Sequence, residues 1–189
     1  MPDAEVTLWP EVDLPRPPSE CLAALIADTP WRQDRITLFG KSHLQPRLAA
    51  WYGDPGSRYT YSGLTLEPLS WTPLLCDLKT VVEEISDAQF NSVLLNYYRD
   101  NRDAMGMHAD DEVELGPEPA IASLSLGETR TLVFKHRFDK SIETFRLPLP
   151  SASLLVMRGR TQACWKHGIN RSAKTCGPRV NLTFRMIRQ

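Results

Sequence analysis

The sequence predicts a mainly β fold with flanking helices (α+β), in which helices of the N-terminal half buttress a double-stranded β-helix, or jelly roll. After Asn91, short strand-like segments are separated by turn residues, near 92–98, 106–110, 119–126, 130–136, 142–147, 152–157, 162–167 and 179–187. Eight short strands at such close spacing are typical of a sandwich or jelly roll rather than of a parallel α/β sheet. Before Asn91, helical patterns occur, so helices are expected to brace the sheets.

The chain is predicted to begin with an arm followed by a helix. Residues 1–17 are polar and rich in proline, which favours an arm that lies over the domain or is partly disordered. The helix should begin near Pro18. It should end before Thr29, because Thr29 precedes a proline and such a residue avoids the helical conformation.

A strand, a turn, a mixed passage and a second helix are expected next. Residues 35–39 have the pattern of a strand, and residues 40–42 have that of a turn. Residues 51–63 combine Gly, Asp and Pro with aromatic residues, which indicates a loop followed by a strand. Thr72 then caps a helix whose first turn contains Pro73 and whose apolar residues recur at helical spacing.

Size and composition exclude several protein classes. The chain has 189 residues, enough for one domain with a substantial core. No apolar run approaches the roughly 18 residues of a membrane span, so we expect no membrane association, and a monomer is the default. The acidic N-terminus lacks the basic start and apolar stretch of a secretory signal. We therefore expect a cytoplasmic protein in a bacterium, or a nuclear one in a eukaryote.

The cysteines and the charges say less about function than the size and composition do. The four cysteines are scattered without a C-x-x-C pair, which favours reduced thiols over disulfides or a zinc site. The net charge is −1, yet residues 126–189 hold thirteen Lys or Arg and three acids, whereas residues 77–118 hold eleven acids. This asymmetry permits a local basic face for nucleic acid, and equally permits ordinary solvated strand faces.

A histidine and a carboxylate two residues apart form the first candidate site. In an extended chain His108 and Asp110 point to the same face and Asp111 to the opposite one. They would supply two ligands of a 2-His-1-carboxylate metal site, which leaves positions open for substrates. His167 is the best third ligand, because it ends the seventh predicted strand, which in a jelly roll can lie beside the strand of His108. The other histidines are His43, in an N-terminal loop, and His136, at a basic strand end.

The last predicted strand forms the second candidate site. Alternation places four polar residues on one face, namely Arg179, Asn181, Thr183 and Arg185. Such a face is costly to bury unless an anion fills the space beside it. Because arginine binds carboxylates in a bidentate fork, two arginines at this spacing could hold both ends of a short dicarboxylate. The alternative is the solvated face of an edge strand.

Together these motifs resemble the AlkB family of iron(II)- and 2-oxoglutarate-dependent dioxygenases, whose fold is the cupin-like jelly roll. The third histidine follows Asp110 by 57 residues, and R-x-N-x-T-x-R begins twelve residues later. The likeness extends from Phe39 to Ile187 and includes Asn96-Tyr97-Tyr98, the segment 121–127 and Arg146-Leu147-Pro148-Leu149. The branch that repairs alkylated bases in duplex DNA is the most similar, on the segments 39–41, 51–54 and 59–63.

The resemblance implies a role for each candidate residue. Fe(II) would be bound by His108, Asp110 and His167. The co-substrate 2-oxoglutarate would be held at its distal carboxylate by Arg179 and near the metal by Arg185, with hydrogen bonds from Asn96, Tyr98 and Asn181. Tyr61 would stack on a flipped base with Tyr59 nearby, Asp111 and Glu112 would contact or orient that base, and Phe39 would fill the gap in the duplex. Arg171 and Lys174 could meet phosphates. Tyrosine at the stacking position departs from the phenylalanine or tryptophan common in the family, which bears on substrate preference.

The implied activity is oxidative demethylation of N-alkylated DNA bases such as 1-methyladenine and 3-methylcytosine. It would consume 2-oxoglutarate and O2 and release formaldehyde, succinate and CO2. A base nitrogen inside a duplex is out of reach, so the base must be flipped, and methylation that weakens pairing lowers that cost. The alternatives are the same chemistry on RNA or single-stranded DNA, and a catalytically silent nucleic-acid-binding jelly roll. The retained buried charges argue against a silent site.

In this interpretation residues 1–17 form an N-terminal arm and residues 18–189 a single catalytic domain. Helices and nucleotide-recognition strands and loops would occupy 18–91, and the jelly-roll core 92–189.

Overall fold

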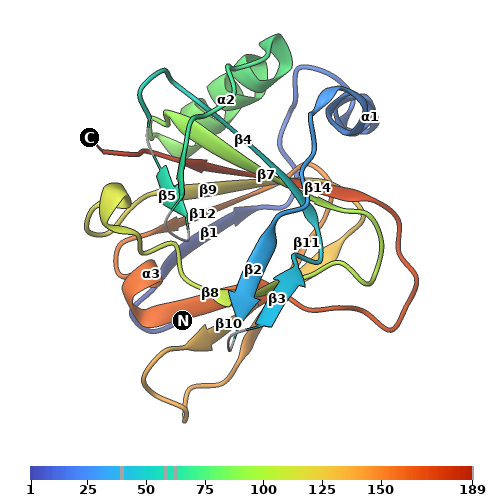
Figure 1. Ribbon diagram of the computed structural model, residues 1–189. Coiled ribbons are helices and arrows are strands. Elements are labelled where there is room, and N and C mark those ends of the chain that lie inside the picture. Colours follow the sequence, from blue (N-terminus) through green and yellow to red (C-terminus); the bar gives the residue numbers. More distant parts are fainter. Residues whose placement is uncertain (39–40, 58, 62–63, 189) are drawn as a thin grey trace.

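The computed structural model describes residues 1–38, 41–57, 59–61 and 64–188, with residues 36–38, 41, 42, 59–61 and 64–66 described by their backbone alone. Within them, two antiparallel sheets face each other, as the jelly-roll prediction requires (Figure 1). The larger sheet runs in the order β1 (Glu5–Trp9), β12 (Ser153–Arg158), β9 (Ile121–Gly127), β14 (Arg179–Arg185), β7 (Ser92–Tyr98) and β4 (Leu48–Gly53). The smaller sheet runs in the order β11 (Phe145–Leu149), β10 (Arg130–His136), β13 (Trp165–Ile169) and β8 (Met105–His108).

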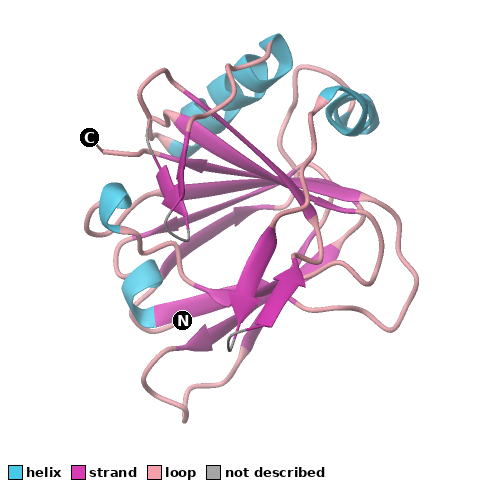
Figure 2. Ribbon diagram, in the orientation of Figure 1, coloured by secondary structure: helices cyan, strands magenta, loops and turns pink. Residues whose placement is uncertain are grey.

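Two helices cover the outer face of the larger sheet (Figure 2). These are α1 (Pro18–Asp28) and α2 (Pro73–Ser86), both at the predicted positions. The Thr72 hydroxyl accepts a hydrogen bond from the Leu75 N–H at 3.3 Å, which confirms the predicted cap. No helix in the described residues is long and apolar enough to cross a membrane.

Strand β14 shows how alternation builds both sides of the larger sheet. Its odd-numbered polar residues and its even-numbered apolar residues are all buried. Val180, Leu182 and Phe184 pack in the core beneath the helices, so the polar residues point into the space between the sheets. The solvated edge-strand alternative is wrong, because β14 lies between β9 and β7 in the sheet.

Two small antiparallel hairpins form two-stranded sheets of their own, labelled in Figure 1. One pairs β2 (Arg35–Leu38) with β3 (Lys41–Leu44), and the other pairs β5 (Tyr59–Tyr61) with β6 (Leu64–Leu66). The predicted turn at residues 40–42 is therefore too long, since Lys41 and Ser42 already pair in β3. The first predicted strand is confirmed over Arg35–Leu38.

Two further segments differ in detail from the expected local structure. Within the arm predicted over residues 1–17, residues 5–9 form a strand, β1, which pairs with β12 along its whole length. The reason is apolar alternation in a short segment, because Val6 and Leu8 pack against the inner core while their neighbours point away. The strand predicted over 162–167 is preceded by a short helix, α3 (Thr161–Cys164), and runs over Trp165–Ile169 instead.

Candidate metal and co-substrate site

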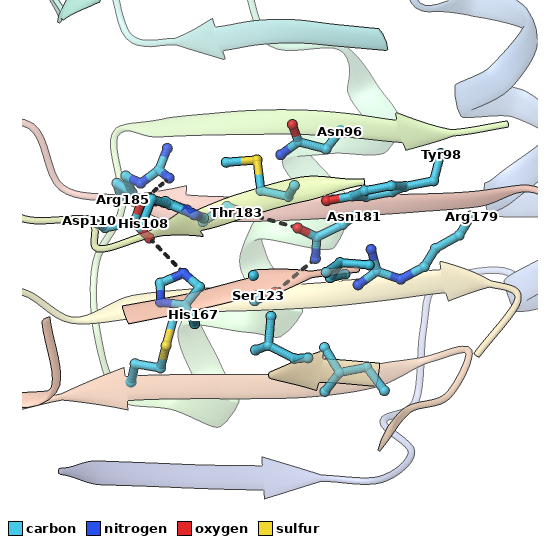
Figure 3. A pocket seen from close by; sticks show the side chains of 16 residues that line it. Asn96, Tyr98, His108, Asp110, Ser123, His167, Arg179, Asn181, Thr183 and Arg185 are labelled. Atoms are coloured by element: carbon cyan, nitrogen blue, oxygen red, sulfur yellow. Dashed lines mark hydrogen bonds and ion pairs between the residues drawn. The ribbon is translucent and has the colours of Figure 1, made fainter. Parts of the chain in front are cut away.

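A cavity between the two sheets collects the polar side chains of several strands (Figure 3). Asn96 and Tyr98 come from β7, and His108 and His167 come from β8 and β13. The polar face of β14 lies along the same cavity, with Arg185 beside Asp110 at one end and Arg179 with Tyr98 at the other. The sheets thus bring together residues that are more than eighty positions apart in the sequence.

The three predicted metal ligands converge. β8 and β13 pair in a register that places His108 opposite His167. Nε2 of each imidazole lies 3.8 Å from an Asp110 carboxylate oxygen, and one donor atom from each of the three residues lies within 4.8 Å of the others. Two imidazoles and one carboxylate at this separation form the ligand set of a 2-His-1-carboxylate site.

The electrostatics of these residues suit a cation. Burial opposes ionisation of the Asp110 carboxyl, but Arg185 and the two histidines hold its pKa at about 2. Burial lowers the pKa of His167 to about 4, against the opposing pull of Asp110, so the imidazole is neutral near pH 7 and keeps a lone pair for a metal. Asp110 Oδ1 accepts a hydrogen bond from Arg185 Nη2 at 2.6 Å. Oδ2 is buried and accepts no hydrogen bond from the described residues. The residues therefore fit a divalent metal ion.

The far end of the cavity suits an anion. Arg179 is 1% exposed, and its Nη2 donates to Ser125 Oγ at 2.9 Å. Its Nε and Nη1 are buried and donate to no acceptor in the described part of the chain. The guanidinium carbon lies 5.1 Å from the centroid of the Tyr98 ring. Burial lowers the pKa of Arg179, with Tyr98 acting in the opposite direction. A buried guanidinium with two unused donors fits a carboxylate.

Hydrogen bonds fix the cavity wall between the two ends. Asn181 Nδ2 donates to Ser123 Oγ at 2.8 Å, and Thr183 Oγ1 donates to Asn181 Oδ1 at 3.0 Å (Figure 3). Asn96 Oδ1 accepts from Arg47 Nε at 2.7 Å. Polar side chains that already bond one another lose little mobility when a ligand arrives, which makes the wall preorganised.

The residues predicted to meet the base or DNA lie elsewhere. Asp111 does not line the cavity and accepts a hydrogen bond from Arg137 Nη1 at 2.6 Å, and Glu112 is half-buried next to it. Arg171 and Lys174 are exposed in the loop between β13 and β14. Tyr59 and Tyr61 belong to β5 by their backbone, and their side chains lie outside the description. Phe39 also lies outside the described residues.

Several residues of the site were not predicted from the sequence. Ser123 and Ser125 alternate within β9 and could have been identified by the same face argument that identified the polar face of β14. Arg47 lies in an irregular segment, and Gln162 lies in a helix where the sequence predicted a strand. Periodicity therefore did not indicate either residue. His43 is exposed, and His136 Nδ1 accepts a hydrogen bond from the Asp139 N–H.

A family model described as the 2OG-Fe(II) oxygenase superfamily matches residues 10–185 of the chain. The chain belongs to this superfamily. Its Fe(II) and 2-oxoglutarate agree with the ligand set at Asp110 and with the buried cation at Arg179.

Two curated relatives indicate which members of the superfamily the chain resembles. The chain is 42% identical over 174 residues to the alpha-ketoglutarate-dependent dioxygenase alkB homolog 3 of Mus musculus, covering 88% of this chain and 60% of the relative. It is 44% identical over 159 residues to the DNA oxidative demethylase ALKBH2 of Homo sapiens, covering 81% of this chain and 61% of the relative. These relatives confirm the AlkB resemblance. The chain spans about 60% of their length.

A solved structure supports the fold of this 2OG-Fe(II) oxygenase. The structure titled OsALKBH1 superposes with a TM-score of 0.65 at 16% sequence identity, and covers 98% of this chain and 97% of its own. At such low identity the likeness concerns the fold alone. It agrees with the jelly roll that the sequence predicts.

Proposed function

We propose that the chain is an oxidative DNA dealkylase that uses Fe(II), 2-oxoglutarate and O2 to remove methyl groups from base nitrogens. The observation that carries this proposal is the cavity with two chemically distinct ends. One end presents an ionised carboxylate between two imidazoles, and the other presents a buried guanidinium with unused donors. A metal ion with open positions and a dicarboxylate co-substrate satisfy both ends at once.

The residues of the cavity divide the work. His108, Asp110 and His167 would hold Fe(II), which when bound supplies the redox chemistry that oxidises both 2-oxoglutarate and the N-methyl carbon. Arg179 would pair with the distal carboxylate of 2-oxoglutarate, while Asn181 and Asn96 line the wall between the two ends. Arg185 lies against Asp110, so it would neutralise charge where the co-substrate meets the metal. The buried wall excludes water, and the oxidation itself would depend on the bound metal.

Duplex DNA is the substrate that the sequence resemblance favours, with 1-methyladenine and 3-methylcytosine as the lesions. The names of the relatives at 40–44% identity support DNA, since they include DNA oxidative demethylase. We further propose that Tyr61 stacks on the flipped base with Tyr59 nearby, that Asp111 and Glu112 orient it, and that Phe39 fills the gap left behind. Arg171 and Lys174 are exposed, as phosphate contacts require.

Mass spectrometry of methylated oligonucleotides tests the proposal. The protein is incubated with Fe(II), 2-oxoglutarate and O2 and with 1-methyladenine placed in duplex DNA, single-stranded DNA or RNA. We expect loss of the methyl group and release of formaldehyde, and both should depend on 2-oxoglutarate. The reaction on duplex DNA should be at least as fast as the reaction on single-stranded DNA or RNA. Faster reaction on single-stranded DNA or RNA would reassign the substrate. No demethylation of any oligonucleotide by protein that binds Fe(II) would contradict the proposal and favour a silent nucleic-acid-binding protein.

A further inference from the structure

The backbone that carries Asp110 lies beyond the end of its strand. β8 ends at His108, so the sheet hydrogen bonds that fix His108 opposite His167 stop two residues before the carboxylate ligand. The Asp110 N–H instead donates to the side-chain Oε1 of Gln162, at 3.0 Å. Gln162 is 2% exposed, and a buried amide that accepts this bond has few alternative positions.

Gln162 also belongs to the segment that leads to the third metal ligand. It lies in α3, and β13 with His167 begins directly after that helix. α3 is itself fixed, because Thr161 Oγ1 accepts from the Glu5 N–H at 2.9 Å and donates to the Arg158 carbonyl at 2.6 Å. The hydrogen bond from the Asp110 N–H to Gln162 therefore connects one ligand to the segment that precedes another.

Arg137 strengthens this connection from the other side. Its Nη1 donates to the Gln162 carbonyl at 3.0 Å and to Asp111 Oδ2 at 2.6 Å. Its own N–H donates to the Cys164 carbonyl at 2.8 Å. Both residues 110 and 111 are thus attached to α3, although neither has a partner strand in the described sheets.

The Asp110 carboxylate needs this attachment because it is also pulled by a cation. Arg185 Nη2 contacts Asp110 Oδ1 at 2.6 Å, whereas each imidazole Nε2 is 3.8 Å from the carboxylate. If the loop were free to move, the Asp110 carboxylate would shift toward Arg185. The bond to Gln162 holds the backbone so that the carboxylate stays between the two imidazoles.

We propose that Gln162 is a positioning residue that preorganises the metal site by fixing the backbone of Asp110 against α3. This inference rests on the proposed function of His108, Asp110 and His167 as metal ligands. Loss of such an outer partner typically weakens metal binding about 10- to 100-fold. The change is visible without turnover, because only the metal-binding step depends on it.

Anaerobic titration with Co(II), followed by its visible absorption bands, provides the test. Gln162→Met keeps the side-chain length and removes the acceptor, and we expect it to bind Co(II) about 10- to 100-fold more weakly than the wild type. Ser153→Ala is the control. It removes the hydrogen bond from an equally buried hydroxyl to the Pro150 carbonyl, outside α3, and we expect its Co(II) affinity to stay within about twofold of the wild type if Gln162 acts through Asp110.

The outcomes separate the two claims. Equal Co(II) affinity of Gln162→Met and wild type, or equal losses in both variants, would overturn the positioning role alone. Absence of Co(II) binding by the wild type would overturn the metal site itself. A second measurement needs no variant. In the metal-free wild type we expect the Asp110 amide to exchange its hydrogen slowly, like the amides of β13, and rapid exchange would contradict the proposal.

Discussion

The cavity wall and the two hairpins are held in the molecule by different means. Strands β14 and β7 lie inside a six-stranded sheet, with apolar residues packed beneath helices on the opposite face. The hairpins β2–β3 and β5–β6 are two-stranded sheets of their own, and a hairpin of this size is marginally stable by itself. The contrast teaches that the residues for chemistry are fixed by the core, while Tyr59 and Tyr61, proposed for base recognition, lie on a separate hairpin. Changes in one region should leave the other largely intact.

Removal of the carboxylate ligand should have the largest effect. Asp110→Ala deletes the anionic ligand of the proposed site, and we expect demethylation to fall to background while thermal unfolding stays cooperative. The measurement is formaldehyde release together with circular dichroism on heating. His43→Ala is the control, because His43 is exposed and is not among the residues that line the cavity. Activity that persisted in Asp110→Ala with added iron would mean that the metal is bound elsewhere.

Loss of the buried guanidinium should come second. Arg179→Met removes a buried cation, two of whose donors meet no acceptor among the described residues, and we expect the Kd for 2-oxoglutarate to rise about a hundredfold or more, as for other buried charged pairs. Isothermal titration of the anaerobic Fe(II) protein measures this Kd. Arg146→Met, at an exposed position, should leave it unchanged. An unaltered Kd in Arg179→Met would move the anchor to Arg185.

Substitution of Phe39, which lies between β2 and β3 in the sequence, should have a smaller and selective effect. If Phe39 fills the gap left by a flipped base, Phe39→Ala should lower activity on duplex DNA about tenfold more than on single-stranded DNA. The measurement compares initial rates on the two forms of the same oligonucleotide. Leu44→Ala, on β3 and 51% exposed, is the control. Equal losses on both forms would remove the duplex wedge.

The smallest expected effect concerns the loop between β7 and β8. Asp103 is buried and bonds Arg99 Nε at 2.8 Å. Burial would raise the pKa of Asp103, but hydrogen bonds and charge from Arg99 lower it overall. A carboxyl with a lowered folded pKa stabilises the fold above its unfolded pKa, and this contribution is lost as pH falls through the folded pKa. Asp103→Asn should therefore lose stability at neutral pH and differ least from the wild type in acid, as measured by urea unfolding. A difference that was constant with pH would exclude this linkage.

Much of the fold and of the chemical site could be predicted from the sequence, because both depend on short-range alternation. The polar face of β14 and the H-x-D motif can each be identified from the order of neighbouring residues, and the structure places both at one cavity. The alternation in β1 is too short to predict a strand by itself, and its partner β12 lies almost a whole chain away in the sequence. Gln162 was missed for a related reason: its role depends on one bond across 52 positions, and nothing in the local pattern indicates such a partner. The contact of Asp111 with Arg137 is likewise long-range.

The most direct test is the affinity of the anaerobic Fe(II) protein for 2-oxoglutarate, measured side by side for the wild type, Arg179→Met and Phe39→Ala. It asks whether the residues that bind the co-substrate are separate from those that recognise DNA. The separation predicts a large loss of affinity in Arg179→Met and an affinity equal to that of the wild type in Phe39→Ala. A comparable loss in Phe39→Ala would contradict it, because a residue proposed for recognition would then contribute to the co-substrate site as much as Arg179 does.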